Sequence, residues 1–546
     1  MATYGIDLGT TYSCIATLDE NGNPRIIQNL ADGTDTLASA VFFDSEDNTI
    51  VGSAAKDMVE TDGDRVVQFV KRQIGKPNAR TYEFFGKTYN PVDISALILK
   101  RIKQYADEQG EDVHDVVITC PAYFGYEEKD ATKKAGELAG LNVLTLINEP
   151  TAAALSYCAR QFSDEKTILV YDLGGGTFDV TIMKMSLVTN SEGKDVQKIK
   201  VISSGGNDLL GGKDWDDKLF NFILNAFCEE NGLTPDDIDA ETRQSIRSKV
   251  EITKKKLSNV ESTKVKISKD GQVTNITVSR SDFEAITADL VAQTMTYVEE
   301  TLNKAGNVDI DLVLLVGGSS YMPMIRNAVE NRFPGKVKLH DPDRAVAAGA
   351  AIYASMLVEE DSEPKGPEPG PYTEGPGPDP GEPKGSVPGT DSPITLVDIT
   401  SRSFGPGVLM NNVYMIDNII KINTEMPAIV EKTYYTVNAN QSGVLFCVFE
   451  NMSKEEAVVP SRDSEGNEQK SNPSDCVKYL GELELPLPPN TPAGAPIDTT
   501  FQVDAGGIYV KVTNPQTGES KDATITYVNT VDTSNSPVKT MTVSAE

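Results

Sequence analysis

The chain has 546 residues, of which 39% are hydrophobic, so it is long enough to form several domains with buried cores. Its formal net charge of −31 repels phosphate backbones and anionic lipid, which argues against nucleic acid and membranes as partners. The first residues contain no basic and apolar leader, and no stretch stays apolar for the roughly 18 residues of a membrane span. Six cysteines and two histidines lack the spacing of a metal site or a disulfide framework. We therefore expect a cytoplasmic, multi-domain protein.

Strand-like and helix-like patterns alternate through residues 1–357, which predicts an α/β domain. The clearest predicted strands are 116–119, 167–171 and 312–316, and the clearest helices are 127–139 and 281–305.

The composition changes abruptly after this region. Pro and Gly make up more than half of residues 363–393, a composition that cannot bury enough apolar surface to fold, so residues 358–393 are predicted to be a linker. Residues 394–546 contain short strands separated by turn residues and no long amphipathic helix, which predicts an antiparallel β-sandwich without a helical lid. The predicted strands there are 434–437, 443–449, 508–512 and 523–527.

Two segments, 5–18 and 171–183, repeat one pattern of strand, Asp, Gly/Thr turn and second strand. The N-terminal region is therefore predicted to contain two related lobes. Each turn leads into a second strand, which indicates a hairpin and not the strand-to-helix junction of a dinucleotide site.

The two turns are predicted to clamp phosphate groups from both sides. Asp7 and Asp172 precede the turns, where carboxylates can hold a hydrated Mg²⁺. The turn glycines are expected to adopt positive φ and to aim backbone N–H groups at an anion, while threonine hydroxyls add donors. These residues are Gly9, Thr10, Thr11, Gly174, Gly175, Gly176 and Thr177.

Other nucleotide motifs are incomplete. The segment 207–214 has Asn207 in place of the first glycine of a P-loop and Asp214 after its lysine, so it is interpreted as a glycine-rich turn near the nucleotide. Gly317 and Gly318 follow a buried strand, where the backbone could approach a flat ring or a ribose.

Long motifs in fixed order resemble the ATPase domain of the heat shock protein 70 (DnaK-type) chaperone family over about residues 3–357: GIDLGTTYS, VITCPAYF, INEPTAAALSY, YDLGGGTFDV, LVGGSS and DPDRAVAAGAA. The segments ITLVDIT, INTEMP, VNANQSGVLFCVFE and DAGGIYVKV resemble the substrate-binding β domain of the same family. The resemblance implies an actin-like, duplicated ribonuclease H-like ATPase domain joined to a β-sandwich. It also implies Mg²⁺-dependent hydrolysis of ATP to ADP and phosphate, with K⁺ as a further candidate ion, and control by ATP over the binding of extended, unfolded polypeptides.

Residue roles follow from the same resemblance. Lys71, Glu149, Asp179 and Thr177 would be catalytic, with Asp7 and Asp172 at the metal. Tyr12, Glu251, Lys254, Lys255, Ser258, Gly317, Gly318, Tyr321 and Asp343 would join the two turns in binding nucleotide. Residues 251, 254, 255 and 258 have the spacing of one helix face. Leu409, Tyr434, Val437 and Val444 would line the peptide groove, although plain sandwich core remains an alternative for them.

Several positions depart from the family pattern. Thr145 replaces the Arg at which a J-domain co-chaperone docks, which puts that docking in doubt, although a nucleotide exchange factor remains an expected partner. Lys129 replaces an Arg that relays domain coupling, and Tyr321 replaces an adenine-stacking Arg. The long linker replaces a short apolar one, so we expect weaker control of peptide binding by ATP.

Two other functions remain open from the sequence. The first is a small-molecule kinase of the same actin-like fold. The second is a nucleotide-regulated scaffold or exchange factor that barely hydrolyses ATP, which the replaced Thr145 and Lys129 favour and the retained Lys71, Glu149 and Asp179 oppose.

Overall fold

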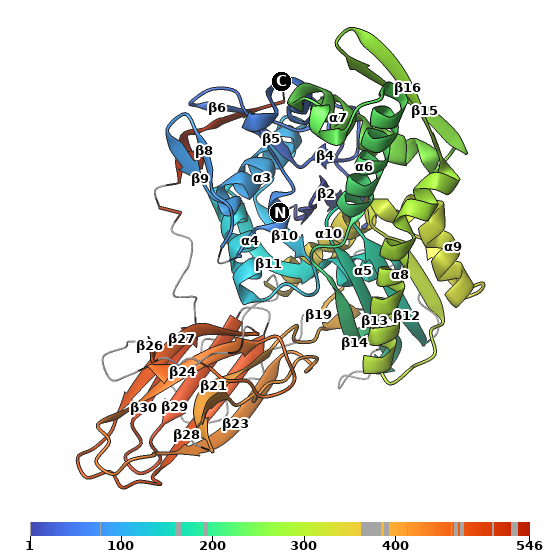
Figure 1. Ribbon diagram of the computed structural model, residues 1–546. Coiled ribbons are helices and arrows are strands. Elements are labelled where there is room, and N and C mark those ends of the chain that lie inside the picture. The colour runs from blue at the N-terminus through green and yellow to red at the C-terminus, as the bar shows by residue number, and fades with distance from the viewer. Residues whose placement is uncertain are drawn as a thin grey trace.

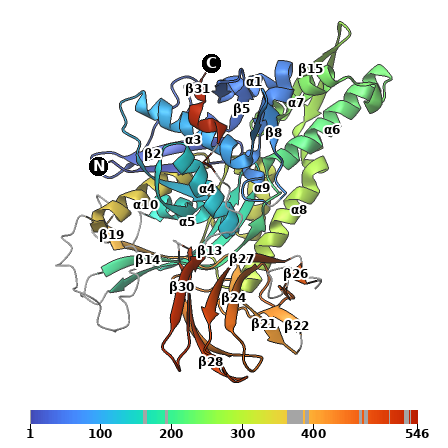
Figure 2. The same ribbon diagram turned by 90° about the vertical axis from the view of Figure 1, so that its left-hand side faces the viewer.

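The structure is a computed structural model, and Figures 1 and 2 show it from two directions. It describes residues 2–76, 78–158, 165–189, 195–361, 384–386, 393–411, 413–459, 461–462, 468–469, 474, 476–504, 507–525, 533–534 and 536–545. Most of the predicted linker, 358–393, therefore lies outside the described residues.

The first lobe, residues 2–158, is built on a six-stranded sheet with the order β11-β10-β1-β2-β3, in which β4 pairs with β2. Strands β1, β10 and β11 run parallel to one another, whereas β2 runs antiparallel to both β1 and β3. The strands are β1 (Tyr4–Asp7), β2 (Tyr12–Leu18), β3 (Pro24–Ile26), β4 (Leu37–Ala38), β10 (Asp115–Cys120) and β11 (Asn142–Asn148).

The second lobe, residues 165–343, repeats this arrangement in a sheet to which β20 and β19, from beyond the lobe, add two strands, so that the seven-stranded order is β18-β17-β12-β13-β14-β20-β19. Here β12, β17 and β18 are parallel, and β13 is antiparallel to β12 and β14, so the predicted duplication is confirmed. The strands are β12 (Lys166–Leu173), β13 (Phe178–Thr189), β14 (Asp195–Asn207), β17 (Leu312–Val316), β18 (Val337–Leu339), β19 (Lys384–Ser386) and β20 (Pro393–Val397).

Two helices, α5 (Glu149–Cys158) and α10 (Ala345–Asp361), lie between the sheets of the two lobes. Their side chains share one buried core with strands of both sheets. The helices cross very closely, because a Cβ on Gly349 would lie 1.7 Å from the carbonyl oxygen of Ala152. The two lobes are thus joined through a tightly packed helix pair below the cleft that separates them.

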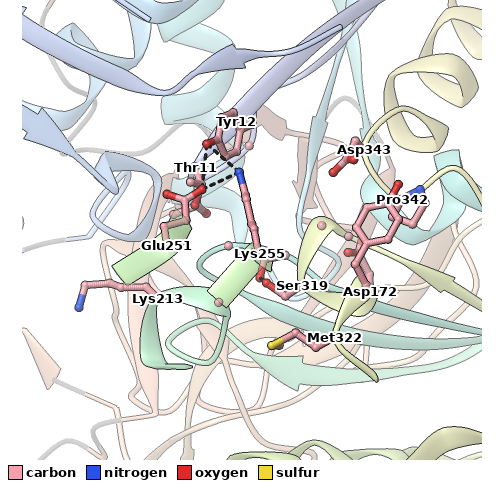
Figure 3. A pocket seen from close by; sticks show the side chains of 18 of the residues that line it. Thr11, Tyr12, Asp172, Lys213, Glu251, Lys255, Ser319, Met322, Pro342 and Asp343 are labelled. Atoms are coloured by element: carbon pink, nitrogen blue, oxygen red, sulfur yellow. Dashed lines mark hydrogen bonds and ion pairs between the residues drawn. The ribbon is translucent and has the colours of Figure 1, made fainter. Parts of the chain in front are cut away.

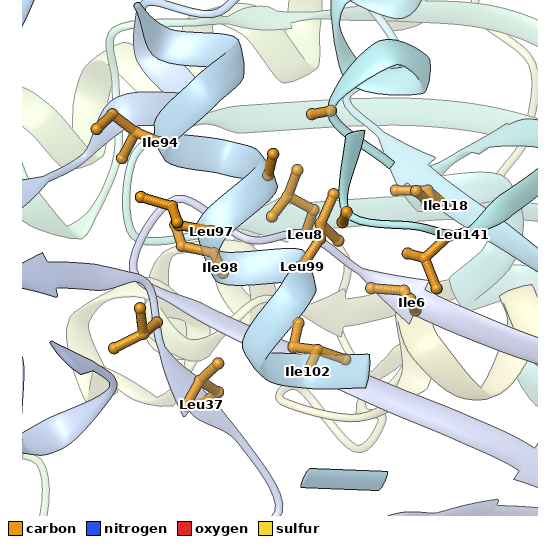
Figure 4. Close-up of a cluster of buried hydrophobic side chains, with 14 of the residues drawn as sticks. Ile6, Leu8, Leu37, Ile94, Leu97, Ile98, Leu99, Ile102, Ile118 and Leu141 are labelled. Carbon is orange, nitrogen blue, oxygen red and sulfur yellow. The ribbon is translucent and has the colours of Figure 1, made fainter. Parts of the chain in front are cut away.

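The outer faces of the sheets carry further helices. In the first lobe α3 (Pro91–Asp107) and α4 (Tyr126–Leu138) cover the sheet, and Figure 4 shows Ile94, Leu97 and Ile98 of α3 facing the buried cluster. Helix α3 begins where Asn90 accepts hydrogen bonds from the N–H groups of Val92 and Asp93. In the second lobe α8 (Arg280–Lys304) and α9 (Pro323–Arg332) take the corresponding position.

Each lobe also carries an outer part beside the cleft. In the first lobe this is a four-stranded sheet with the order β31-β6-β5-β7, together with short helices and a hairpin. Its elements are β5 (Ala40–Phe43), β6 (Asn48–Val51), α1 (Ser53–Asp57), α2 (Val59–Asp62), η1 (Gly63–Arg65), β7 (Val66–Gln68), η2 (Val70–Arg72), β8 (Tyr82–Phe84), β9 (Lys87–Tyr89) and β31 (Thr542–Ser544). In the second lobe it comprises α6 (Gly212–Asn231), η3 (Pro235–Asp237), α7 (Ala240–Leu257), β15 (Ser262–Lys269) and β16 (Gln272–Ser279).

The β-rich domain consists of two four-stranded antiparallel sheets that share one hydrophobic core. Its strands span residues 403–525 and not the predicted 394–546, because residues 394–397 pair with β14 of the second lobe and residues 542–544 pair with β6 of the first lobe. One sheet has the order β22-β21-β24-β27 and the other β23-β28-β29-β30. The strands are β21 (Ser403–Met410), β22 (Val413–Ile416), β23 (Ala428–Tyr435), β24 (Gly443–Asn451), β27 (Val477–Pro486), β28 (Pro496–Asp504), β29 (Gly507–Thr513) and β30 (Ser520–Ile525), with a small hairpin of β25 (Ser461–Arg462) and β26 (Glu468–Gln469). Among the described residues after β20 the only helical element is η5 (Pro537–Thr540).

The β-rich domain packs directly against the lower part of both lobes (Figures 1 and 2). Strand β20 pairs in parallel with β14, Lys478 forms an ion pair of 2.7 Å with Glu127 at the start of α4, and Asn148 donates a hydrogen bond of 2.6 Å to Asp398. These contacts hold the domains together despite the length of the linker, and the expected weaker control of peptide binding by ATP stays a prediction. No helix in the described ranges is both long and apolar enough to cross a membrane.

Candidate active site

A cavity of about 620 Å³ lies in the cleft between the lobes (Figure 3). Both hairpin turns, the start of α6, the end of α7 and the turn after β17 line it. Every residue predicted to bind nucleotide or metal, or to be catalytic in the cleft, lines this cavity except Gly176 and Asp179. The fold therefore brings together residues that are hundreds of positions apart in the sequence.

The two turns are hairpins, as predicted, because β1 pairs with β2 and β12 pairs with β13 in antiparallel register. The turns also touch each other across the cleft: a Cβ on Gly175 would lie 1.9 Å from the Thr11 hydroxyl, and a Cβ on Gly176 would lie 2.3 Å from Thr10. The hydroxyl of Thr11 is buried and has no hydrogen-bond partner in the described part of the chain. A polar group left unpaired inside a cavity is suited to a polar ligand.

The expectation that the turn glycines adopt positive φ is wrong, because neither Gly9 nor any glycine from 174 to 176 does so. Glycine is required at these positions for space: a Cβ on Gly9 would meet the carbonyl oxygen of Tyr12 at 1.9 Å. Gly317 is different, because it has a φ of 77° and a Cβ there would lie 2.4 Å from the carboxylate of Asp172.

Buried carboxylates surround one lysine at the base of the cavity. Lys71, in the short helix η2, forms an ion pair with Glu149 at the start of α5. Burial alone favours loss of the lysine proton, but the carboxylates of Glu149 and Asp7 raise the pKa of Lys71, so it stays charged. This ammonium group is therefore available to neutralise an anionic ligand.

Burial and the charge of Glu149 raise the pKa of Asp7 to about 7, even though Thr119 donates a hydrogen bond of 2.9 Å to its carboxylate. Burial and the same glutamate also raise the pKa of Asp172 well above its ordinary value. The charge of Lys71 lowers both pKa values but only partly offsets these effects, so negative charge is left in excess, a condition that a divalent cation would relieve. No group of three or more His, Cys, Asp or Glu side chains in the described ranges forms a metal site, so phosphate and water would complete the coordination of Mg²⁺.

Asp179 lies behind the cavity wall, paired in register with Asp172 across the second hairpin. One oxygen of its carboxylate accepts a hydrogen bond of 3.0 Å from the N–H of Ala122, and the other has no partner among the described residues. Burial, Glu149 and Asp172 raise the pKa of Asp179 well above its ordinary value. The structure therefore places Asp179 next to the acidic cluster but not on the cavity surface.

A polar network joins the two lobes along one side of the cavity (Figure 3). Tyr12 donates a hydrogen bond of 2.8 Å to Glu251, and Lys255 donates one of 3.0 Å to the Tyr12 hydroxyl. Lys56 of α1 forms an ion pair with Glu251 and joins the network from the first lobe. Burial opposes ionisation of Glu251, but Lys56 and Lys255 hold its pKa well below the ordinary value. The charged network thus bridges the two lobes over the cavity.

The opposite wall consists of η4 (Gly318–Tyr321) and the loop before α10. Tyr321 is partly exposed to the cavity, and its hydroxyl hydrogen-bonds to the carboxylate of Asp343. Burial raises the pKa of Asp343, and this hydrogen bond opposes the shift. A Cβ on Gly318 would lie 3.0 Å from Asp343, so this glycine keeps the wall open for a flat group.

Sequence analysis missed several residues of the site. Lys56 bears no motif and could not be found from the sequence. Arg72 follows Lys71 directly and donates hydrogen bonds of 2.7 Å to the carbonyl oxygen of Gly176 and to Asp214, so it links the lobes. Ser319, Pro342 and Val346 also line the cavity; they lie within the family motifs, but no role was predicted for them. Further lining residues without a predicted role are Thr36, Asp216, Asn259, Met322, Pro323 and Arg326.

The four predicted peptide-groove residues lie in different settings in the β-rich domain. Leu409 on β21 and Val437, just beyond β23, are exposed, whereas Val444 is only partly exposed. Tyr434 packs against Phe446 at the edge of the sandwich core and donates a hydrogen bond of 2.8 Å to Asp417. Leu409 and Val437 therefore do not belong to the core, and the groove assignment stays a prediction.

The two substituted positions also have defined settings. Thr145 lies on β11, where it pairs with Val117 of β10. Lys129 lies on α4 close enough to Asp398 that its charge opposes the rise in the pKa of that buried carboxyl. Lys129 thus contributes to the junction between α4 and the end of β20.

These features define a class: a two-lobed α/β protein that encloses a polar, acid-rich ligand cavity between duplicated sheets and carries an all-β domain. Comparison with protein families gives the particular assignment. The model of the family described as Hsp70 protein matches residues 3–365, and the chain belongs to this family. Hsp70 proteins are ATPases that bind ATP and ADP with Mg²⁺ and act as chaperones on unfolded peptides together with co-chaperones, so a chaperone function of this general type is supported.

Proposed function

We propose that this chain is a cytoplasmic, ATP-dependent chaperone that hydrolyses ATP in an actin-like domain to regulate binding of extended apolar peptides in its β-rich domain. The observation that carries the proposal is the meeting of two Asp-headed hairpins around one buried lysine in the cavity.

The cavity residues fit magnesium and a triphosphate. Asp7 and Asp172 would hold a hydrated Mg²⁺, which neutralises phosphate charge when it is bound. Thr10, Thr11 and Thr177 line the cavity, and their hydroxyls would donate hydrogen bonds to phosphate oxygens. This arrangement accounts for the unpaired hydroxyl of Thr11 and for the excess of buried carboxylates.

The catalytic groups would act by position and charge. The ammonium group of Lys71 would neutralise charge that develops on the transferred phosphoryl group, and Glu149 would hold this lysine and orient the attacking water. Asp179, which lies behind the cavity wall, would help to orient metal-bound or attacking water. ADP would remain on the same residues after hydrolysis, and K⁺ is a further candidate ion in the acidic cluster.

The nucleoside would lie between α7 and η4. Glu251, Lys254, Lys255 and Ser258 form one face at the end of α7, and all four line the cavity. Tyr321 offers an aromatic face in place of the guanidinium that the family pattern has there. An adenine ring would stack on it, with the ribose toward α7.

The proposed control of peptide binding runs through the contacts between the domains. Strand β20 belongs to the sheet that carries the second hairpin, and Asn148, next to Glu149, bonds to Asp398. A change at Glu149 would therefore reach the β-rich domain through neighbouring residues. The J-domain co-chaperone remains in doubt because Thr145 replaces the Arg at its docking position.

Titration of a fluorescent apolar peptide with ATP and with ADP tests the proposal. We expect weaker peptide binding with ATP than with ADP; equal affinity in both states would refute ATP control. Terminally labelled ATP provides the second arm, because label transferred to an acceptor other than water would identify a kinase, and absence of turnover would identify a scaffold.

A further inference from the structure

The C-terminal segment, residues 536–544, does not belong to the β-rich domain but lies on the first lobe. After η5, strand β31 pairs in parallel with β6, with Thr542 opposite Asn48 and Ser544 opposite Ile50. In Figures 1 and 2 this segment lies among the N-terminal elements around α3 and β5, far from the β-rich strands. We call this segment the tail.

Three apolar side chains anchor the tail. Val538, Met541 and Val543 are 0%, 2% and 3% exposed and belong to the core of the first lobe. Lys539, Thr540 and Thr542, between them, are exposed. The tail therefore presents one apolar face to the lobe and one polar face to solvent, as an edge strand does.

The first lobe supplies a polar frame around these anchors. Lys100 of α3 donates a hydrogen bond of 2.7 Å to the carbonyl oxygen of Met541, and the N–H of Thr542 donates one of 2.9 Å to Asp47. The hydroxyl of Ser536 donates a hydrogen bond to the buried carboxylate of Asp93. Backbone pairing plus side-chain pockets is the way in which sheet edges bind extended peptides.

Chain length gives the tail a mechanical consequence. The last sandwich strand, β30, ends at Ile525 and the tail begins at Ser536, so the connection reaches at most about 36 Å. The linker between Asp361 and Pro393 is far longer and, extended, could reach on the order of 100 Å. With the tail docked, the β-rich domain is confined near the first lobe whatever the linker does, and its effective concentration there rises.

We propose that the edge of β6 and the adjoining face of α3 form an acceptor site for a segment of pattern Val-x-x-Met-x-Val, folded as a short 3₁₀ helix followed by a strand, and that the chain's own tail occupies it as a strap. The strap fastens the β-rich domain to the first lobe and offsets the length of the linker. The acceptor site shares its core with Val70 and Ile74, which flank Lys71, so strap docking also supports the element that carries this lysine.

A disulfide trap tests the occupant. Asn48→Cys with Thr542→Cys places two cysteines at paired positions of neighbouring strands, whereas Asn48→Cys with Lys539→Cys does not. Five of the six native cysteines are buried, so background oxidation is small. We expect an intramolecular disulfide in the first variant only. Dimers joined by a disulfide would assign the site to a second copy, and equal or absent cross-linking in both variants would overturn the proposal.

A matched pair of variants of the full chain tests the strap. Val538→Ser, Met541→Ser and Val543→Ser are combined in one variant, and Lys539→Ala, Thr540→Ala and Thr542→Ala in the control. A dye pair on α4 and β28 reports docking of the β-rich domain. The first variant is expected to raise the ratio of undocked to docked molecules about tenfold, equivalent to about 1.4 kcal/mol, and the control to leave it unchanged.

The strap is refuted if both variants keep the docking ratio of the parent chain. Circular dichroism distinguishes an unfolded variant from a folded variant whose β-rich domain has undocked. The cross-linked Asn48→Cys, Thr542→Cys protein tests the strap without weakening the core of the first lobe. Oxidation should lower the undocked fraction and reduction should restore it. An undocked fraction that ignores the state of this disulfide would also refute the strap.

Discussion

Lys71 and Glu149 form an ion pair at the base of the cleft in which the two side chains are only 4% and 9% exposed. The same cavity contains Asp7 and Asp172, so one lysine faces three carboxylates. Buried charges of one sign are costly unless a ligand or ion balances them. The surroundings of this ion pair therefore suit a bound cation and a phosphate group.

Replacing Lys71 by Ala should abolish ATP turnover while nucleotide still binds. The variant loses the ammonium group that would neutralise the transferred phosphoryl group, so kcat should fall by at least about 10²-fold to 10³-fold. Binding should persist because the hairpins, α7 and η4 remain. Phosphate release measures turnover, and calorimetry with ATP and magnesium measures binding.

Lys103→Ala is the matched control, because Lys103 forms a surface ion pair with Asp107 on α3, away from the cavity. Its turnover should equal that of the parent chain. A Lys71→Ala protein that hydrolyses ATP at the parent rate would remove this lysine from its proposed role.

Tyr321→Ala should weaken nucleotide binding without changing kcat. The aromatic face that would stack on the base is lost, a contact of about 0.5–1.5 kcal/mol, so Kd should rise about 2-fold to 10-fold. Tyr321→Phe retains the ring and loses only the hydroxyl that bonds to Asp343. Titration of fluorescent ADP compares the two variants.

If stacking matters, the Phe variant binds nucleotide much as the parent chain does and the Ala variant does not. Equal weakening of both variants would assign the effect to the hydroxyl and Asp343, and no effect in either would place the base elsewhere.

The sequence was sufficient to predict the duplicated hairpins and a β-rich domain, because each rests on a local pattern, whereas most of the cleft residues were predicted from the family resemblance. The strand-Asp-turn-strand repeat is contiguous, and residues 251, 254, 255 and 258 have the spacing of one helix face. For Gly9 the predicted residue was correct but the predicted reason, a positive φ, was wrong. Glycine is needed there because its backbone lies close to the carbonyl oxygen of Tyr12, and this contact depends on how the turn closes.

Features that depend on long-range packing were not predictable. Lys56 reaches Glu251 only because the lobes face each other across the cleft. From the sequence Val543 falls within the predicted sandwich domain, and only its pairing with Thr49 places it in the first lobe. The length of the linker does not reveal the contacts between the domains either, because the pairing of β20 with β14 and of β31 with β6 joins segments that lie far apart in the sequence.

Docking of the β20 segment should weaken as pH rises. Burial raises the pKa of Asp398 above the ordinary carboxyl value of 3.8, although Lys129, the N–H of Ile399 and Asn148 oppose the shift. In the undocked form the carboxyl of Asp398 would have its ordinary pKa, so the docked form binds the proton of this carboxyl more strongly. The contribution of this proton to docking is complete at a pH below the ordinary pKa of the carboxyl. It is lost as pH rises through the raised pKa of the docked form.

Asp398→Asn mimics the protonated state and should keep the domains docked as pH rises above the ordinary carboxyl range, whereas docking of the parent chain should decline as the carboxyl of Asp398 loses its proton. A dye pair on α4 and β28 measures docking in the absence of nucleotide. Asp270→Asn, in the exposed turn between β15 and β16, should follow the parent chain. A parent chain with pH-independent docking would contradict the role given to Asp398.

Leu409→Asp combined with Val437→Asp should abolish peptide binding and leave stability nearly unchanged. The two side chains are 50% and 59% exposed, so they contribute little to the sandwich core, and substitution should change the free energy of unfolding by about 0.5 kcal/mol or less per site. If they line the groove, each should bury its apolar surface against the peptide, and a charge there should raise Kd about 10-fold or more.

Leu187→Asp is the matched control, because Leu187 is 51% exposed but lies on β13 in the second lobe. It should bind the fluorescent peptide as the parent chain does. Urea unfolding separates the two interpretations of Leu409 and Val437: a large loss of stability would make them core residues. Unchanged peptide affinity in a folded double variant would place the groove elsewhere on the β-rich domain, away from β21 and the end of β23.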